Sequence, residues 1–292
     1  MTSFAAAVKK YETLCEQNDV PAETVMAFLV ELSRQERYNL YMHYEEEMPA
    51  ELEEQFSAGM ERILKQEPMA HVLGYSWFYG YKMLVSGDVL IPRPETEELC
   101  AHILSRIDRY FPAGELACAD IGTGSGAIAI TVAKEEPRVR MTATDISAEA
   151  VAMAERNAAL NEADITFMTG DYLQPLIAAG IRLDILISNP PYIPAEETME
   201  HSVVDFEPHV ALFGGDDGLK GYRAIFRSCR QVLKEKAMMA FEMGWDQRER
   251  MGRLVEELLP EARYEILRDM NGKDRMLFVY FGLDPDTQQN ND

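Results

Sequence analysis

Residues 116–131 read "LACADIGTGSGAIAIT", an apolar run ending in an aspartate, a loop with three glycines, and a second apolar run. The first run is short and continuous, as in a strand buried on both faces of a parallel sheet. In such sheets, ligands bind beyond the carboxyl ends of the strands. Gly122, Gly124 and Gly126 allow the backbone to turn sharply and to approach a ligand closely. We therefore predict a ligand-binding loop between a strand and a helix of an α/β sheet.

Strands and helices continue to alternate after this loop. Continuous apolar strands separated by helices indicate a mostly parallel sheet covered on both faces, here a Rossmann-like sheet of seven strands. The last two strands are joined by "MNGKD", whose Asn271-Gly272 pair is typical of a hairpin, so one strand should be antiparallel. Besides the run at 116–122, the candidate strands are 140–146, 165–171, 183–189, 237–243, 264–269 and 275–281.

The region before the sheet has a different pattern. In residues 22–35, "AETVMAFLVELSRQ", apolar residues recur at helical spacing, and residues 1–75 are predicted to form a small helical domain. Residues 76–92 combine aromatic and β-branched residues with glycines, which predicts a β-hairpin linker. The α/β domain should then span residues 93–283, and the polar residues 284–292 are expected to be a disordered tail.

The charge of the chain argues against one class of partner. The sequence has 28 Lys and Arg against 50 Asp and Glu, a net charge of −22. Affinity for nucleic acids comes largely from cationic side chains that neutralise phosphates. We therefore expect no direct binding of nucleic acid.

The spacing of cysteines and histidines and the lengths of the apolar segments indicate whether the chain has a metal site and whether it enters a membrane. The four cysteines lie far apart without a C-x-x-C pair, and the five histidines show no metal-ligand spacing, so no metal site is expected. No segment has the apolar length of a signal peptide or the ~18 apolar residues of a membrane span. These patterns predict a cytoplasmic protein that does not enter a membrane.

The glycine spacing alone leaves two classes of cofactor open. Gly122-x-Gly124-x-x-Ala127 satisfies the dinucleotide-binding pattern, and Asp145 follows at a suitable distance. However, Asp120 would be unfavourable beside a pyrophosphate, whereas it suits the ammonium and sulfonium groups of S-adenosylmethionine. We therefore expect S-adenosylmethionine as the cofactor. The predicted cofactor loop comprises Asp120, Gly122, Thr123, Gly124, Ser125 and Gly126.

Acidic residues also end the next two strands. Asp145 ends the second strand in "TATDIS", where its carboxylate could accept hydrogen bonds from both hydroxyls of a ribose. Asp171 and Tyr172 end the third strand in "TGDY". There Asp171 could accept from the adenine amino group, and Tyr172 could supply an aromatic surface beside the base. Either aspartate alone could be a helix cap, but acidic residues ending three successive strands favour a nucleoside cofactor.

The fourth strand ends in "SNPPYIP", residues 188–194. The nitrogen of an amide or aromatic amine is a poor nucleophile, so it must be placed in line with the leaving group and given acceptors for its two N–H groups. The side-chain oxygen of Asn189 and the rigid backbone carbonyl of Pro190 are such acceptors. Tyr192 could lie against the flat face of the substrate group. We predict that Asn189, Pro190 and Tyr192 are catalytic, that Asn189 also contacts the cofactor, and that Pro191 helps to bind the substrate.

Together, "DIGTGSGAIAI", "SNPPYIP" and "VLIPRPETEEL" resemble the HemK-type release-factor glutamine methyltransferase family. The segments "FEPHVALFGGDDGLKGYR", "FEMGWDQ" and "NGKDRMLFVYF" show the same resemblance. The Asn-Pro-Pro-Tyr corner is shared with DNA and RNA amino-methyltransferases and does not select the substrate. "IPRPETE" and "EPHVALFGGDDGL" are much more specific to the family.

The resemblance implies a function and a role for each matched position. The family has a seven-stranded methyltransferase sheet behind a helical substrate-recognition domain. It methylates the side-chain amide of the glutamine in the Gly-Gly-Gln motif of class-1 peptide chain release factors. By motif match, residues 122–126 line the methionine end of S-adenosylmethionine, Asp145 holds the ribose and Tyr172 lies beside the adenine. Residues 189–192 hold the glutamine. Arg93, Pro94 and Glu95 are expected to border the substrate pocket, and Glu207 and Pro208 to support it.

Two other functions remain open at the level of sequence. The shared corner also fits a nucleic-acid adenine or cytosine amino-methyltransferase, although residues 1–85 hold only 7 Lys and Arg against 14 Asp and Glu. A non-catalytic cofactor-binding module would keep the glycine loop but would not need the corner at residues 189–192. We expect a monomeric enzyme that acts on release factors.

Overall fold

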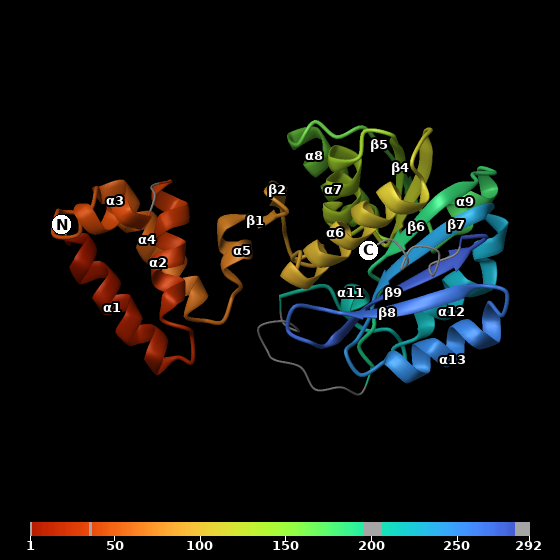
Figure 1. Cartoon of the computed structure of the whole chain (residues 1–292). Helices are drawn as coiled ribbons and strands as arrows, with labels where there is room; N and C mark the ends of the chain where they lie inside the picture. Colours follow the sequence, from red (N-terminus) through yellow and green to blue (C-terminus); the bar gives the residue numbers. More distant parts are fainter. Residues whose placement is uncertain (1, 35–36, 196–205, 284–292) are drawn as a thin grey trace, which may run out of the picture. The chain divides into compact units, whose positions relative to one another are not determined.

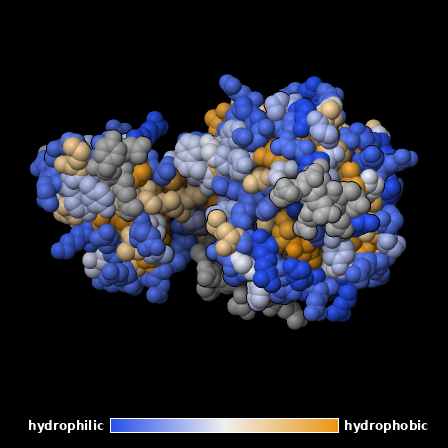
Figure 2. Space-filling view, in the orientation of Figure 1, coloured by the Kyte–Doolittle hydropathy of each residue, from blue (hydrophilic) through white to orange (hydrophobic). Residues whose placement is uncertain are grey.

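The computed structural model describes residues 2–34, 37–195 and 206–283 (Figure 1). Contacts divide the described chain into a smaller unit, formed chiefly by the residues up to Tyr75, and a larger unit that begins at Ser76. The tail expected at residues 284–292 lies outside the described residues. On the face shown in Figure 2, hydrophilic residues cover most of each unit.

The smaller unit is helical. Its apolar residues face inward, so that Val8, Phe28, Phe56 and Met60 are fully buried in one core. Gly59 is needed in this core because a Cβ at that position would lie 2.1 Å from the ring of Phe28. The helices in its described residues are α1 (Phe4–Gln17), α2 (Glu23–Ser33), α3 (Arg37–Met42), α4 (Ala50–Ile63) and α5 (Met69–Leu73).

A two-stranded hairpin, β1 (Tyr75–Phe78) and β2 (Tyr81–Leu84), leads into the α/β sheet. Its turn residues Tyr79 and Gly80 both have positive φ, 51° and 82°, as a tight two-residue hairpin turn requires.

The sheet of the larger unit has seven strands in the order β5-β4-β3-β6-β7-β9-β8. Neighbouring strands are parallel except where β9 pairs with β7 and with β8. The predicted seven-stranded sheet with one antiparallel strand is therefore confirmed. The strands are β3 (Leu116–Ile121), β4 (Val139–Asp145), β5 (Ile165–Thr169), β6 (Leu183–Ser188), β7 (Leu233–Glu242), β8 (Arg263–Arg268) and β9 (Asp274–Phe281).

Helices cover both faces of this sheet, and alternate residues of each central strand face opposite cores. In β3, Cys118 packs in one core and Ala119 in the other. Helices α6 (Pro94–Tyr110), α7 (Ala127–Glu135) and α8 (Ala148–Leu160) cover one face, whereas α9 (Gln174–Ala178), α12 (Lys220–Ser228) and α13 (Arg248–Leu258) cover the other (Figure 1). A short helix, α11 (His209–Leu212), and the 3-10 turn η1 (Cys229–Gln231) complete the unit.

Candidate active site

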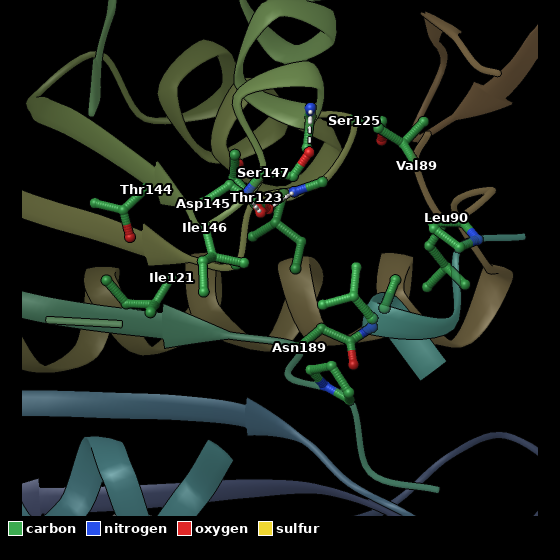
Figure 3. A pocket seen from close by; sticks show the side chains of 18 of the residues that line it. Val89, Leu90, Ile121, Thr123, Ser125, Thr144, Asp145, Ile146, Ser147 and Asn189 are labelled. Atoms are coloured by element: carbon green, nitrogen blue, oxygen red, sulfur yellow. Dashed lines mark hydrogen bonds between the residues drawn. The ribbon is translucent and has the colours of Figure 1, made fainter. Parts of the chain in front are cut away.

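A cavity of about 250 Å³ lies at the carboxyl ends of β3, β4 and β6. Because β4 and β6 flank β3 on opposite sides, the chain order reverses at this point of the sheet, where open α/β sheets bind their ligands. Figure 3 shows Asp145 and Thr123 on one side of the cavity and Asn189 on the other. Of the residues predicted from sequence, the cavity is lined by Arg93, Gly122, Thr123, Gly124, Ser125, Asp145, Tyr172, Asn189 and Pro191, but not by Asp120, Gly126, Asp171, Pro190, Tyr192 or Glu207.

The glycine loop has a conformation that other residues rarely adopt. Gly122, Gly124 and Gly126 have φ values of +73°, +55° and +82°. A Cβ at Gly122 or Gly124 would meet nothing within 4 Å, so these two positions are open towards a ligand. At Gly126 a Cβ would lie 3.1 Å from that of Ala154. Gly126 therefore allows the start of α7 to pack against α8.

Asp145 holds this loop at the end of the neighbouring strand. Its Oδ2 accepts a hydrogen bond from the amide of Gly124 at 2.9 Å, and its Oδ1 accepts from the amide of Ser147 at 3.0 Å. Ser147 in turn caps α8 by accepting from the amide of Ala150 at 3.1 Å. One carboxylate thus joins the glycine loop to the next helix while it lines the cavity.

Asp120 lies behind the loop, and its side chain is buried. One oxygen accepts a 2.7 Å hydrogen bond from the hydroxyl of Thr123, and the other has no partner among the described residues. Burial, the largest cause, raises the pKa of Asp120 to about 7. A buried carboxylate with an unsatisfied oxygen next to the glycine loop favours positive charge on a ligand that binds at the loop.

The end of β5 contributes one side chain to the cavity. Tyr172 lines it and has a φ of +43°, a conformation that is strained for a residue other than glycine. Asp171 is exposed and does not line the cavity.

The Asn-Pro-Pro-Tyr corner follows β6 directly. Asn189 and Pro191 line the cavity, whereas Pro190 is buried beside it. The hydroxyl of Tyr192 lies 3.4 Å from the carboxylate of Glu242, and burial raises the pKa of this tyrosine. In this structure Tyr192 therefore supports the corner from behind.

The loop that includes "FGGDDG" packs on the backbone of the corner. The amide of Gly214 donates to the carbonyl of Ile193 at 2.8 Å. Cβ atoms at Gly214 and Gly218 would lie only 2.3 Å from the carbonyl oxygen of Pro191 and 2.2 Å from that of Tyr192, respectively. These glycines thus allow the loop to pack directly on the corner.

Glu207 and Arg93 form an ion pair beside the cavity. Glu207 is buried and also accepts a hydrogen bond from the amide of Ile91 at 3.2 Å. Of the pair, Arg93 lines the cavity. Glu207 thus fixes the segment that carries Arg93.

The structure adds polar residues that the sequence analysis did not single out. The buried side chain of Asn157 donates to the carbonyls of Leu84 and Ser125, at 3.0 and 2.8 Å, and so joins the hairpin to the glycine loop. Thr96 lines the cavity and donates to the buried Glu242 at 2.6 Å. Glu242 could have been found from its position, because it ends an apolar strand as Asp145 does.

The described residues form neither a metal-binding cluster nor a membrane-spanning helix. In this part of the chain, no group of three or more His, Cys, Asp or Glu residues is arranged to hold a metal ion. Across residues 2–34, 37–195 and 206–283, no helix has the length and apolar character needed to span a bilayer.

Comparison with known proteins gives matches along most of the chain. Residues 6–74 match the PrmC N-terminal domain, and residues 102–206 match the methyltransferase small domain. The chain is 40% identical to a release factor glutamine methyltransferase of Bacillus cereus, over 94% of this chain and 97% of that protein. It is 44% identical to one of Bacillus subtilis, over 72% of this chain and 74% of that protein.

A solved structure gives independent support for the fold. A methyltransferase from Pyrococcus furiosus superposes with a TM-score of 0.52 at 18% identity, covering 77% of this chain and 98% of that one. At this identity the likeness concerns the fold alone. The identity and coverage of the two Bacillus relatives show that the chain belongs to the release factor glutamine methyltransferase family.

Proposed function

We propose that this chain transfers a methyl group from S-adenosylmethionine to the side-chain amide nitrogen of the glutamine in the Gly-Gly-Gln motif of class-1 peptide chain release factors. The observation that carries the proposal is a shared cavity: Asn189 and Pro191 line the same space as the glycine loop and Asp145. A corner suited to an amide nitrogen therefore faces a loop suited to a nucleoside cofactor. Membership of the family supports the same substrate.

The residues of the cavity fit S-adenosylmethionine. Gly122 and Gly124 leave open space at the loop, and the carboxylate of Asp145 faces the cavity as an acceptor for hydroxyl groups. Tyr172 and the half-exposed Ile146 supply apolar surface on which a base can rest. The buried carboxylate of Asp120, next to the glycine loop, favours positive charge on the ligand at the loop. When bound, the cofactor supplies a methyl group on a cationic sulfur.

The corner acts by holding the substrate amide. The side-chain oxygen of Asn189 and the carbonyl of Pro190 accept hydrogen bonds from the amide N–H groups, which orients the nitrogen lone pair towards the methyl group. The fixed φ angles of the two prolines keep this backbone rigid. Such positioning can contribute roughly 7–11 kcal/mol when the reacting atoms are well held. The nitrogen loses its proton after alkylation, so this scheme does not require a strong base.

The smaller unit supplies substrate recognition in this proposal, and the domain borders expected from the sequence define the parts. Residues 1–75 contact the release factor, and residues 93–283 bind the cofactor and carry out the transfer. Residues 76–92 link these two parts.

We further propose that the protein acts in the cytoplasm as a monomer. All four cysteines are buried and free, as suits a reducing compartment. Size-exclusion chromatography with light scattering would test the monomer.

A labelling assay tests the function. Purified protein is incubated with S-adenosylmethionine carrying a labelled methyl group and with a purified class-1 release factor. Label should enter the release factor, and it should be lost when the glutamine of the Gly-Gly-Gln motif is replaced by alanine. Label in that alanine variant, or label entering RNA or DNA in place of the protein, would contradict the proposal.

A further inference from the structure

A chain of polar contacts runs behind Asn189 and ends on a buried carboxylate. The Nδ2 atom of Asn189 lies 3.4 Å from Oγ1 of Thr96. The same Thr96 hydroxyl donates to Oε2 of Glu242 over 2.6 Å. Thr96 and Glu242 are both buried, and Thr96 reaches the cavity beside Asn189.

The sheet itself places two of these residues together. Strands β6 and β7 are parallel, and Ser188 is the register partner of Phe241. Asn189 directly follows β6 and Glu242 is the last residue of β7, so the two lie at the carboxyl edge of the sheet on neighbouring strands. Thr96 comes from the first turn of α6, which begins at Pro94.

The direction of each hydrogen bond determines how the amide of Asn189 is oriented. Thr96 donates its single hydroxyl proton to Oε2 of Glu242. Burial raises the pKa of Glu242, whereas this bond and the charge of Arg275 favour the ionised form, which can only accept. The oxygen of Thr96 is then left as an acceptor towards Asn189. Only the Nδ2 atom of an asparagine can donate to it, because the opposite amide orientation would bring two acceptors face to face. The oxygen of Asn189 therefore points away from Thr96.

We propose that Thr96 and Glu242 are positioning residues, which hold the Asn189 amide so that its oxygen is presented to the substrate. The inference rests on the proposed function, in which that oxygen accepts from the glutamine amide. The second oxygen of Glu242 lies 3.4 Å from the hydroxyl of Tyr192, so one carboxylate supports both ends of the corner.

The contact distances identify the fixed part of this arrangement. Ordinary hydrogen bonds measure about 2.7–3.2 Å between heavy atoms, so the Thr96–Glu242 bond is tight and both 3.4 Å contacts are long. Hydrogen bonds at active sites commonly shorten when the substrate binds. Thr96 and Glu242 form the rigid base, and Asn189 and Tyr192 adjust against it.

A matched pair at Thr96 tests the role of the hydroxyl. Thr96→Val removes the hydroxyl at nearly constant volume, whereas Thr96→Ser keeps it. For release-factor methylation, kcat should fall about tenfold or more in the valine variant and stay within about threefold of wild type in the serine variant. The Kd for S-adenosylmethionine should change little in both variants. Equal kcat values for the two variants would overturn the inference.

A second pair tests the carboxylate. Glu242→Gln introduces an amide that can donate to Thr96, so the direction of the contacts is no longer fixed and kcat should again fall about tenfold or more. Tyr222→Phe is the control, because the Tyr222 hydroxyl donates to the backbone carbonyl of Glu242 at 2.7 Å and does not touch its carboxylate. This control should lower Tm and leave kcat unchanged. If Glu242→Gln retains the kcat of the control, the inference fails.

An NMR measurement decides the inference without any release factor. In nitrogen-15-labelled protein, the side-chain amide proton of Asn189 that faces Thr96 should exchange slowly with solvent in wild type and in Thr96→Ser. It should exchange faster in Thr96→Val, and equal exchange in all three proteins would refute the positioning role. A wild-type protein that fails to methylate a release factor would count against the proposed function alone, and the amide exchange would still judge this inference.

Discussion

Asp145 and Gly124 are joined by a 2.9 Å hydrogen bond from the glycine amide to Oδ2, so the end of β4 fixes the loop that follows β3. This bond combines two roles in one carboxylate, because Asp145 also faces the cavity as the acceptor proposed for the ribose hydroxyls. The geometry of the loop and the affinity for the cofactor should therefore depend on the same side chain.

Replacing Asp145 by asparagine should weaken cofactor binding. The variant loses the negative charge and one acceptor, and hydrogen bonds to charged groups contribute roughly 1.5–3 kcal/mol each. We expect the Kd for S-adenosylmethionine to rise about 10- to 100-fold in calorimetric titrations. Asp164→Asn, at an exposed position just before β5, is the control and should keep the wild-type Kd. Equal affinity of the two variants would show that Asp145 does not hold the cofactor.

The ionisation of Asp120 should make cofactor binding depend on pH. Its pKa is raised to about 7, mainly by burial, so the carboxylate gains a proton as the pH falls through 7. Because the ionised form favours the cationic cofactor, affinity should decrease from pH 8 to pH 6. In Asp120→Asn this pH dependence should be absent. Calorimetric titrations at several pH values measure the cofactor affinity of wild type and of the variant. If the affinity of the variant depends on pH as that of wild type does, Asp120 is not the source of the pH dependence.

Asp120 should also make the stability of the protein depend on pH, but in the opposite direction: its contribution to stability is larger at low pH, whereas cofactor affinity is higher at high pH. The folded-state pKa of Asp120 lies above its unfolded value of 3.8, so the folded state holds this proton more tightly. The resulting contribution to stability is fully present below pH 3.8, and it is lost as the pH rises through about 7. Without cofactor, Asp120→Asn should therefore gain stability relative to wild type between pH 4 and pH 8, by roughly 2–4 kcal/mol. Urea unfolding at these two pH values measures the difference. A difference that does not change with pH would contradict the assigned pKa.

Packing on the corner predicts a specific effect at Gly218. Both Gly218 and Gly180 have positive φ, +73° and +66°, so an alanine at either position is strained by roughly 1–2 kcal/mol. Only at Gly218 would the new Cβ also meet the carbonyl oxygen of Tyr192, at 2.2 Å. Gly218→Ala should therefore lower turnover about tenfold or more as well as Tm, whereas Gly180→Ala should lower Tm alone. Similar turnover in the two variants would show that this contact does not position the corner.

Asn189→Ala distinguishes an enzyme from a binding module. The variant removes the acceptor for the substrate amide, and loss of one such positioned group at an active site typically reduces kcat by about 100- to 1000-fold. The Kd for S-adenosylmethionine should stay close to wild type, which also shows that the variant is folded. Full turnover in this variant would remove Asn189 from the catalytic role.

The sheet was predictable because its strands are buried on both faces. Continuous apolar runs such as residues 183–189 are typical of strands buried on both faces. The Asn271-Gly272 pair predicted a hairpin because glycine readily adopts a positive φ, and Gly272 has a φ of +77° in the structure. The beginning of β7 was not predictable in the same way. The strand starts at Leu233, whereas the sequence predicted a start at residue 237. The prediction missed residues 234–236 because they are polar and lie at the amino edge of the sheet, where burial is incomplete.

Within the site, local patterns located the loop and the corner but not their supports. The Thr96–Glu242 bond joins residues that are 146 positions apart, and no local pattern records such a partner. The sequence also could not tell which side chain faces the cavity. Asp171 and Tyr172 both follow β5, yet only the tyrosine lines the cavity. Likewise, the raised pKa of Asp120 depends on burial, which only the folded chain determines.

Mapping the methyl group on the product tests the proposed function most directly. A class-1 release factor is incubated with the protein and S-adenosylmethionine, digested, and sequenced by tandem mass spectrometry. The proposed function predicts one added methyl group, on the side-chain nitrogen of the glutamine within Gly-Gly-Gln, which forms about 100-fold or more slowly with Asn189→Ala. A methyl group on any other residue, or an unmodified glutamine after prolonged incubation with active protein, would contradict it.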